Sequence, residues 1–291
     1  MLTPLFRWAG SKTKMKSKYG EDIIPDTSFS RFVDPFFGTG CVSMWMPDNV
    51  DIIASDYNED IINIYKNIQQ DYKTFCDGVD QYQAQYIPLD KEGRRKLYFD
   101  TRHKHGWEYD NLTSQERAVM LFFLLKTSFN GFWQLNKNTN NKFGTPVGLA
   151  NEKDTIYSRD DVKDFSDFAQ RVTFLTGDFA GVINHVTDDS YVYLDPPYRD
   201  CFTNYSSDGF NDDDQSRLCD FMTKCNDIGA KVGMSNKYHF DDFFESRLPN
   251  NFNVLTYEVK YTAGRGAKDG EKVKVTECLI RNFKNSSMLD L

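Results

Sequence analysis

The sequence lacks the features that mark secreted, membrane-spanning and zinc-binding proteins. Its six cysteines are scattered and form no Cys-x-x-Cys pair, which argues against a disulfide framework and against a zinc site. Of the four histidines, His103 and His105 could chelate a metal, but no thiol or carboxylate pattern supports them. The sequence has no apolar run of membrane-spanning length, and its first residues do not resemble a signal peptide. We therefore expect a soluble, cytoplasmic protein without a metal ion and without a membrane partner.

Positive charge is also scarce. The chain has 35 lysines and arginines against 43 acidic residues, a formal net charge of −8. Such a chain is not a general nucleic-acid binder, so any nucleic acid would be held by a local basic patch. Apolar residues make up 40% of the 291 positions, enough for one large α/β domain or a domain with an insertion.

An apolar run that ends in Asp-Pro-Pro-Tyr is the most informative stretch of the chain. Residues Ser190–Leu194 predict a short buried strand, which the two prolines must end because they cannot continue a hydrogen-bonded ladder. Asp195 is thereby placed at the carboxyl end of a strand, the rim where open α/β sheets bind ligands, with Tyr198 three residues on. Hydrogen-bond acceptors beside an aromatic ring suit a planar amine such as a nucleobase. Alternatively, the motif does no more than end a strand.

A glycine-rich turn follows an earlier strand candidate. Residues Arg31–Val33 predict a strand, Asp34–Gly40 a turn and Val42–Met46 a helix, the order that a nucleoside-binding turn requires. The third glycine of the dinucleotide fingerprint is missing, so a pyrophosphate is not implied. A second strand, Asp51–Ala54, ends near Asp56, where a carboxylate can accept hydrogen bonds from ribose hydroxyls. The alternative is a purely structural turn in which Asp56 caps a helix.

Helical and strand patterns alternate along the rest of the chain. Residues 59–102 and 118–125 have helical periodicity, and strands are expected at 172–175, 231–234, 253–261 and 272–283. Strands that alternate with helices, and end in acidic residues such as Asp178, predict an open, mainly parallel α/β sheet with a C-terminal antiparallel hairpin. We expect residues 1–57 and 159–291 to form this domain, with residues 58–158 as an inserted, mainly helical region.

Two further segments suggest contact with an anion or a nucleic acid. Residues 128–146 combine amides, aromatic rings and lysines, and contain no acidic residue. Amides can read base edges and aromatic rings can stack on bases, although a long surface hairpin is the alternative. A Gly-Ser pair within residues 7–18 precedes a lysine-rich helix start whose amides favour an anion, unless the helix is merely basic and solvated.

Five motifs resemble, in order, those of the Dam-type (D12 class) DNA adenine methyltransferases. They are Arg7–Lys12, Asp34–Gly40, Phe129–Gly131, Gly177–Phe179 and Asp195–Tyr198, and the resemblance extends from about Arg7 to Ile280. It implies a Rossmann-like class I methyltransferase fold and an enzyme that transfers a methyl group from S-adenosyl-L-methionine to adenine N6. The substrate would be a short specific sequence in double-stranded DNA, with the target base flipped out. It also implies a monomeric protein of prokaryotic or viral origin, acting in restriction-modification or as an orphan methylase.

The resemblance assigns roles to individual residues. The cofactor-binding set is Trp8, Lys12, Asp34, Phe36, Gly38, Gly40, Asp56, Asp178, Phe179 and Asp195. The catalytic set is Asp195, Pro196, Pro197 and Tyr198. The DNA-binding set is Lys14, Lys126, Phe129, Asn130, Phe132, Trp133, Gln134, Asn136, Lys137 and Lys142. Within these sets, Asp56 would hold the ribose, Asp178 and Phe179 the adenine of the cofactor, and Tyr198 would stack on the flipped base.

At one position the sequence departs from the family pattern. The family usually has a guanine-reading arginine where this chain has Gln134, and glutamine pairs with adenine rather than guanine. The resemblance thus implies a GATC-like target, whereas Gln134 favours adenine at one of its positions. Methylation of RNA or of a glutamine amide would suit the same turn, although asparagine is commoner than Asp195 in amide methylation. Outside enzymes, the alternative is a DNA-binding module without catalysis, which the retained strand-end carboxylates disfavour.

Overall fold

A mostly parallel sheet forms the centre of the computed structural model, which describes residues 2–8, 12, 16–131, 133–149, 154–199, 210–261 and 273–285. Its strands are β1 (Arg31–Asp34), β2 (Asp51–Asp56), β5 (Val172–Thr176), β6 (Ser190–Leu194), β7 (Lys231–Lys237), β8 (Asn253–Tyr261) and β9 (Val273–Arg281). Within these residues the strand order is β5-β2-β1-β6-β7-β9-β8. The pairs from β5 to β7 are parallel, whereas β9 runs antiparallel to both β7 and β8. This Rossmann-like sheet confirms the predicted fold class.

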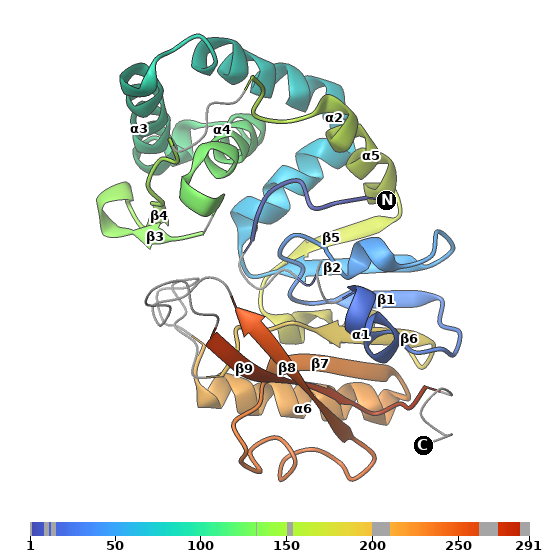
Figure 1. Ribbon diagram of the computed structural model, residues 1–291. Coiled ribbons are helices and arrows are strands. Elements are labelled where there is room, and N and C mark those ends of the chain that lie inside the picture. Colours follow the sequence, from blue (N-terminus) through green and yellow to red (C-terminus); the bar gives the residue numbers. More distant parts are fainter. Residues whose placement is uncertain are drawn as a thin grey trace.

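Helices cover both faces of the sheet. They are α1 (Lys16–Ile23), α2 (Glu59–Tyr86), α3 (Lys91–Trp107), α4 (Ser114–Thr127), α5 (Arg159–Ala169) and α6 (Asp212–Ile228). Phe32 and Val33 are neighbours on β1 but belong to different apolar clusters, because successive side chains of a strand point to opposite faces. The cluster with Phe32 includes side chains of α2 and α5, and the cluster with Val33 includes side chains of α6. Figure 1 shows α2 and α6 on opposite sides of the sheet. The strands around β1 are therefore buried on both sides.

Local sequence signals explain where the helices begin and end. Asn58 accepts hydrogen bonds from the first amides of α2, so Asn58 rather than Asp56 is the helix cap. Thr113 begins α4 with a capping box, in which its side chain accepts from the Glu116 amide and the Glu116 carboxylate accepts from the Thr113 amide. The prediction of an α-helix at residues 42–46 is wrong. Only a single 3-10 turn forms there, at Ser43–Trp45, because Met46 is extended before Pro47 as residues preceding proline usually are.

The helical region is joined to the sheet through the long helix α2. This helix bends at Asp71, whose carboxylate accepts hydrogen bonds from the backbone amides of Lys73 and Thr74 and so caps the second half. Before the bend, α2 packs on the sheet and α5; beyond it, Tyr82 and Tyr86 pack against Phe123 of α4. Figure 1 shows α3 and α4 at the end of the molecule away from β8, with the small hairpin of β3 (Leu135–Asn136) and β4 (Lys142–Phe143) below them.

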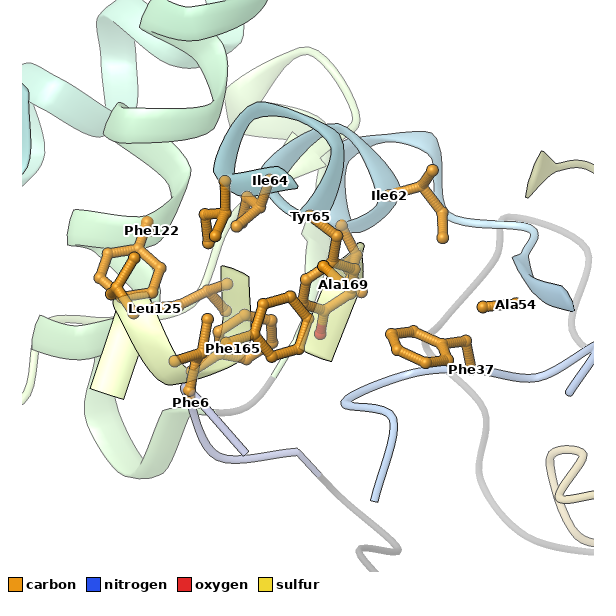
Figure 2. Packing of buried hydrophobic residues seen from close by; sticks show 14 of the residues in the cluster. Phe6, Phe37, Ala54, Ile62, Ile64, Tyr65, Phe122, Leu125, Phe165 and Ala169 are labelled. Carbon is orange, nitrogen blue, oxygen red and sulfur yellow. The ribbon is translucent and has the colours of Figure 1, made fainter. Parts of the chain in front are cut away.

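One apolar cluster runs from the helical region into the sheet domain. Figure 2 shows Tyr65 of α2 close to Phe165 and Phe37, and the Tyr65 ring centroid lies 5.1 Å from each of theirs. Phe6 contacts Phe122 of α4 on the other side of the cluster, with ring centroids 6.3 Å apart. The boundaries near 58 and 158 stay a prediction, because this cluster is continuous across them.

Candidate functional site

Four acidic residues gather at the carboxyl ends of neighbouring strands. Asp34 and Asp56 are the last residues of β1 and β2, and Asp195 directly follows β6. Asp178 follows β5 after one glycine. Because β5, β2, β1 and β6 are parallel and adjacent, their carboxyl ends lie on one rim of the sheet, as the sequence predicts.

The turn after β1 is held from two sides. Gly38 and Gly40 have φ values of +48° and +68°, and a Cβ atom on Gly40 would lie only 2.3 Å from the Phe37 ring. Asp56 accepts hydrogen bonds from the backbone amides of Gly38 and Asn58, both at 2.8 Å. On the other side, the Tyr65 hydroxyl donates to the Gly38 carbonyl at 2.7 Å. The sequence indicates Tyr65 only as part of an apolar helix face, so its role in the turn is not predictable from periodicity.

Asp34 is a buried carboxylate whose two oxygens differ in their hydrogen bonds, and the nearby Phe36 amide favours its ionised form. Its Oδ2 accepts a hydrogen bond from the Ser43 hydroxyl at 2.7 Å, whereas Oδ1 has no hydrogen-bond partner within the described part of the chain. Burial raises the pKa of Asp34 to about 7, and the hydrogen bond from Ser43 opposes this rise. A buried acceptor of this kind suits a cationic or hydrogen-bond-donating ligand.

Asp195 is paired with a buried lysine from the other end of the chain. The Lys12 ammonium donates to both carboxylate oxygens of Asp195, at 2.6 and 2.7 Å, and Lys12 is only 3% exposed. Burial raises the pKa of Asp195, and the adjacent Lys12 charge counteracts the rise. The same ammonium lies 5.0 Å from the centre of the Tyr198 ring. The predicted catalytic residues Asp195 and Tyr198 therefore share one cationic neighbour.

Tyr198 is also linked to an acidic residue on the C-terminal hairpin. Its hydroxyl donates to Glu277 Oε2 over 3.4 Å, and Glu277 lies on β9. Burial raises the pKa of Glu277, which the Lys12 charge lowers and the Asp195 charge raises. The sequence patterns assign no role to the Glu277 side chain.

The predicted adenine-binding pair lies beside an arginine that sequence reasoning missed. Phe179 is buried and its ring is stacked on that of Phe36, with centroids 5.5 Å apart. Arg217 of α6 donates to the Asp178 carboxylate at 2.8 Å and covers the Phe179 ring at 4.9 Å. Arg217 thus occupies part of the surface expected for the adenine ring. No sequence motif around Arg217 predicts this contact.

The loop after α4 presents some of the predicted DNA-binding residues to solvent and buries another. Phe129, Asn130, Gln134 and Lys137 are exposed. Trp133 is buried, with its ring 6.0 Å from that of Trp8, so the expectation of an exposed stacking ring is wrong there. The signal was misleading because a tryptophan in a polar loop can equally anchor that loop to the core.

Other predicted DNA contacts make bonds within the protein. Lys126 donates to the Leu5 carbonyl at 3.0 Å. The Lys142 ammonium lies 3.6 Å from the centre of the Tyr109 ring. Asn136 caps a short 3-10 turn by accepting from the Asn138 amide at 2.8 Å. Lys14 and Phe132 lie outside the described residues.

Within the described ranges, no group of three or more histidines, cysteines or acidic residues is placed to hold a metal ion. His105 is buried against the Tyr109 ring, at a centroid distance of 5.5 Å. None of the described helices combines the length and the apolar character that crossing a membrane requires.

A family model and curated relatives indicate the same enzyme family. The family model described as "D12 class N6 adenine-specific DNA methyltransferase" matches residues 8–263. The chain is 31% identical to the type II methyltransferase M.MjaIII of Methanocaldococcus jannaschii, over 96% of this chain and 99% of that protein. It is 27% identical to the retron Ec67 DNA adenine methylase of Escherichia coli, over 96% and 90%. Among solved structures, the precorrin-6y C5,15-methyltransferase of Geobacter metallireducens covers 97% of this chain at 10% identity, with a TM-score of 0.42.

Proposed function

The chain belongs to the D12 class of N6 adenine-specific DNA methyltransferases, and on this premise we propose which substrate and which residues it uses. The protein transfers a methyl group from S-adenosyl-L-methionine to adenine N6 within a short specific sequence of double-stranded DNA, after the base has flipped out. The observation that carries the proposal is the Lys12–Asp195 ion pair beside the Tyr198 ring, at the rim where the strand-end carboxylates meet.

The residues at the rim fit the proposed cofactor. Its sulfonium and amino groups are cationic, and Asp34 offers a buried oxygen without a hydrogen-bond partner in the described structure. The two glycines of the turn leave room beside neighbouring rings. A Cβ on Gly38 would lie 3.3 Å from the Trp8 indole nitrogen, and one on Gly40 would lie 2.3 Å from the Phe37 ring. Asp56 uses one lone pair on each oxygen for the turn and retains another on each for ribose hydroxyls. Trp8, Lys12 and the pair Asp178–Phe179 complete the proposed site.

The protein contributes orientation and charge to the reaction. When bound, the cofactor would supply an electrophilic methyl group and leave as the neutral thioether, and the methylated N6 would lose one proton to solvent. Asp195 and the Pro196 carbonyl accept hydrogen bonds from the N6 amino group and draw its lone pair out of conjugation with the ring. Tyr198 stacks on the base, which costs a few kcal/mol to unstack and unpair. Lys12 keeps the Asp195 carboxylate ionised, so that it can act as an acceptor. Positioning and local charge then supply most of the rate enhancement.

The helical region is proposed to recognise the target sequence. It presents the exposed side chains of Phe129, Asn130, Gln134 and Lys137 on the same loop. Amide groups can read base edges, and an exposed ring can stack on a base. Among the charged candidates, Lys137 is exposed and so suits a phosphate better than Lys142, which lies on the Tyr109 ring.

A transfer assay tests the proposal directly. The protein is incubated with S-adenosyl-L-methionine carrying a labelled methyl group and with random-sequence duplex DNA, which is then digested to nucleosides. We expect the label in N6-methyladenine. A duplex made only of G·C pairs and an RNA duplex of matched sequence serve as controls. Label in cytosine, in RNA alone or in protein would contradict the proposed substrate.

Cofactor affinity is expected to depend on pH through Asp34. A cationic ligand binds the ionised carboxylate better, so binding lowers the pKa from about 7 and releases a proton. Affinity should therefore rise as pH rises through 7, by about tenfold between pH 6 and pH 8. Calorimetric titration in buffers of different ionisation enthalpy measures both the affinity and the proton release. In Asp34→Asn the pH dependence should be lost, and an unchanged slope would contradict the assignment.

Gln134 is expected to specify one base of the target. Because arginine pairs with guanine through two hydrogen bonds and glutamine pairs similarly with adenine, Gln134→Arg should shift the preference at one target position toward guanine. Each such pair discriminates by about 1–3 kcal/mol, roughly 5- to 150-fold in rate. Sequencing modified adenines in DNA from cells that express each variant measures the shift. Lys137→Arg is the matched control, and an unchanged Gln134→Arg profile would remove Gln134 from the recognition set.

A further inference from the structure

Two fully buried side-chain amides contact the backbone on either side of Tyr198. Gln215 lies in the first turn of α6 and Asn236 lies near the end of β7, and each is 0% exposed. Gln215 Nε2 donates to the Pro197 carbonyl at 2.9 Å. Asn236 Oδ1 accepts from the Arg199 backbone amide at 3.0 Å. The two side chains are joined to each other, because Asn236 Nδ2 donates to Gln215 Oε1 at 3.0 Å.

These bonds fix the two peptide planes that flank Tyr198. The Pro197 carbonyl belongs to the peptide group before Tyr198, and the Arg199 amide belongs to the group after it. Since peptide groups are planar, the only soft backbone torsions between these two groups are φ and ψ of Tyr198 itself. The clamp formed by Gln215 and Asn236 therefore sets the direction of the Tyr198 Cα–Cβ bond, and with it the placement of the ring.

The prolines do not provide this restraint by themselves. Proline fixes its own φ, so Pro196 and Pro197 stiffen the start of the turn but leave both torsions of Tyr198 free. The side chain of Arg199 strengthens the same connection. It donates to both oxygens of Asp212, at 2.9 and 3.0 Å, and to Asp241 at 2.5 Å. The beginning of α6 is thus tied to the turn by Arg199 as well as by Gln215.

We propose that Gln215 and Asn236 are positioning residues that hold the Tyr198 ring in the orientation needed to stack on the flipped adenine. The inference rests on the proposed function, because it takes the adenine as the partner of that ring. Neither amide contacts the reacting groups, and both act through the backbone of the Asp-Pro-Pro-Tyr turn. Buried amides serve this purpose because a lost partner leaves a buried polar group unsatisfied, which penalises other orientations of the turn.

A Gln215→Glu variant separates positioning from a merely structural role. Glutamate has nearly the same shape, and in either protonation state it accepts the hydrogen bond from Asn236. When ionised it cannot donate to the Pro197 carbonyl; when protonated its O–H can. We expect kcat at pH 8 to be about tenfold below that of the unmodified protein, and the ratio of the two to approach one as pH falls to 6. The KM for the cofactor should stay unchanged.

Three further variants complete the test. Gln215→Leu can never donate, so its kcat should be reduced by a similar factor at every pH. Asn236→Asp replaces the amide donor to Gln215 Oε1 by a carboxyl oxygen, which can donate only when it is protonated. The kcat of this variant should therefore also recover at low pH. This variant also keeps the question testable if Gln215→Glu does not fold. Asp220→Asn, an exposed change on α6, is the matched control and should give a ratio near one throughout.

The outcomes distinguish this inference from the proposed function. If the unmodified protein methylates adenine but the Gln215→Glu ratio is the same at pH 6 and pH 8, the clamp is overturned and the function stands. Full kcat in Gln215→Leu would overturn it equally. A duplex with 2-aminopurine at the target position gives a readout without catalysis, because stacking on Tyr198 quenches the fluorescence of the flipped base. Gln215→Leu should raise that fluorescence, and equal quenching would count against the clamp. Absence of methyl transfer by the unmodified protein would instead contradict the proposed function.

Discussion

Replacement of Asp195 by alanine is expected to lower kcat by about 10²- to 10³-fold, the effect typical of losing one preorganised electrostatic group in an active site. The change removes the acceptor for the N6 amino group and also the carboxylate that the buried Lys12 ammonium contacts at 2.6 Å. Single-turnover transfer of a labelled methyl group at saturating DNA and cofactor measures the loss. Asp195 acts as a hydrogen-bond acceptor at a fixed position, and no other side chain is expected to replace it there.

The control for this prediction is a surface carboxylate. Asp167→Ala on α5 removes only an exposed pair with Lys163, so kcat should be unchanged and stability should change by less than about 1 kcal/mol. Asp195→Asn is the informative second variant, because it keeps an acceptor oxygen but loses the charge. It should recover part of the lost rate. Full activity in Asp195→Ala would contradict the proposed mechanism, whatever the behaviour of the asparagine variant.

Lys12→Met is expected to shift the acidic limb of the pH–rate profile to higher pH. Burial raises the pKa of Asp195, and without the Lys12 charge this pKa should rise further. A protonated Asp195 is a weaker acceptor for the N6 amino group, so kcat/KM should fall about tenfold for each unit by which the Asp195 pKa exceeds the assay pH, and should recover in alkaline buffer. Each unit of upward shift corresponds to about 1.4 kcal/mol. Initial rates at low substrate concentration between pH 5 and pH 9 measure the shift.

The same change should make stability more dependent on pH. A carboxyl whose pKa is higher in the folded than in the unfolded protein costs stability above its unfolded pKa, and that cost disappears as the carboxyl is protonated at low pH. Lys12→Met increases the cost, so its melting temperature should fall further below that of the unmodified protein at pH 8 than at pH 5. Lys96→Met, which breaks an exposed pair with Asp100 on α3, should show no such trend. An unshifted acidic limb in Lys12→Met would mean that Lys12 does not control the Asp195 charge.

Local patterns in the sequence were sufficient to place the strand-end carboxylates. The apolar run at Ser190–Leu194 followed by two prolines can only end a buried strand, and the glycines after Asp34 can only form a turn. Parallel strands then bring their carboxyl ends to one rim whatever the details of the packing. The terminal hairpin and most helix positions are also local features, because they depend on periodicity and on capping residues such as Thr113.

Contacts between residues far apart in the chain were decided only by the tertiary structure. Lys12 and Asp195 are separated by 183 positions, and no periodic pattern relates them. Trp133 is buried beside Trp8 and Phe143, so a loop that looks exposed by composition carries a core side chain. The hydroxyl of Tyr65 and the amide of Gln215 are likewise ordinary helix residues until another element supplies their partner. Sequence determines which face of an element is buried, whereas packing determines which buried polar atoms meet, because a hydrogen bond requires both atoms to lie within about 3 Å.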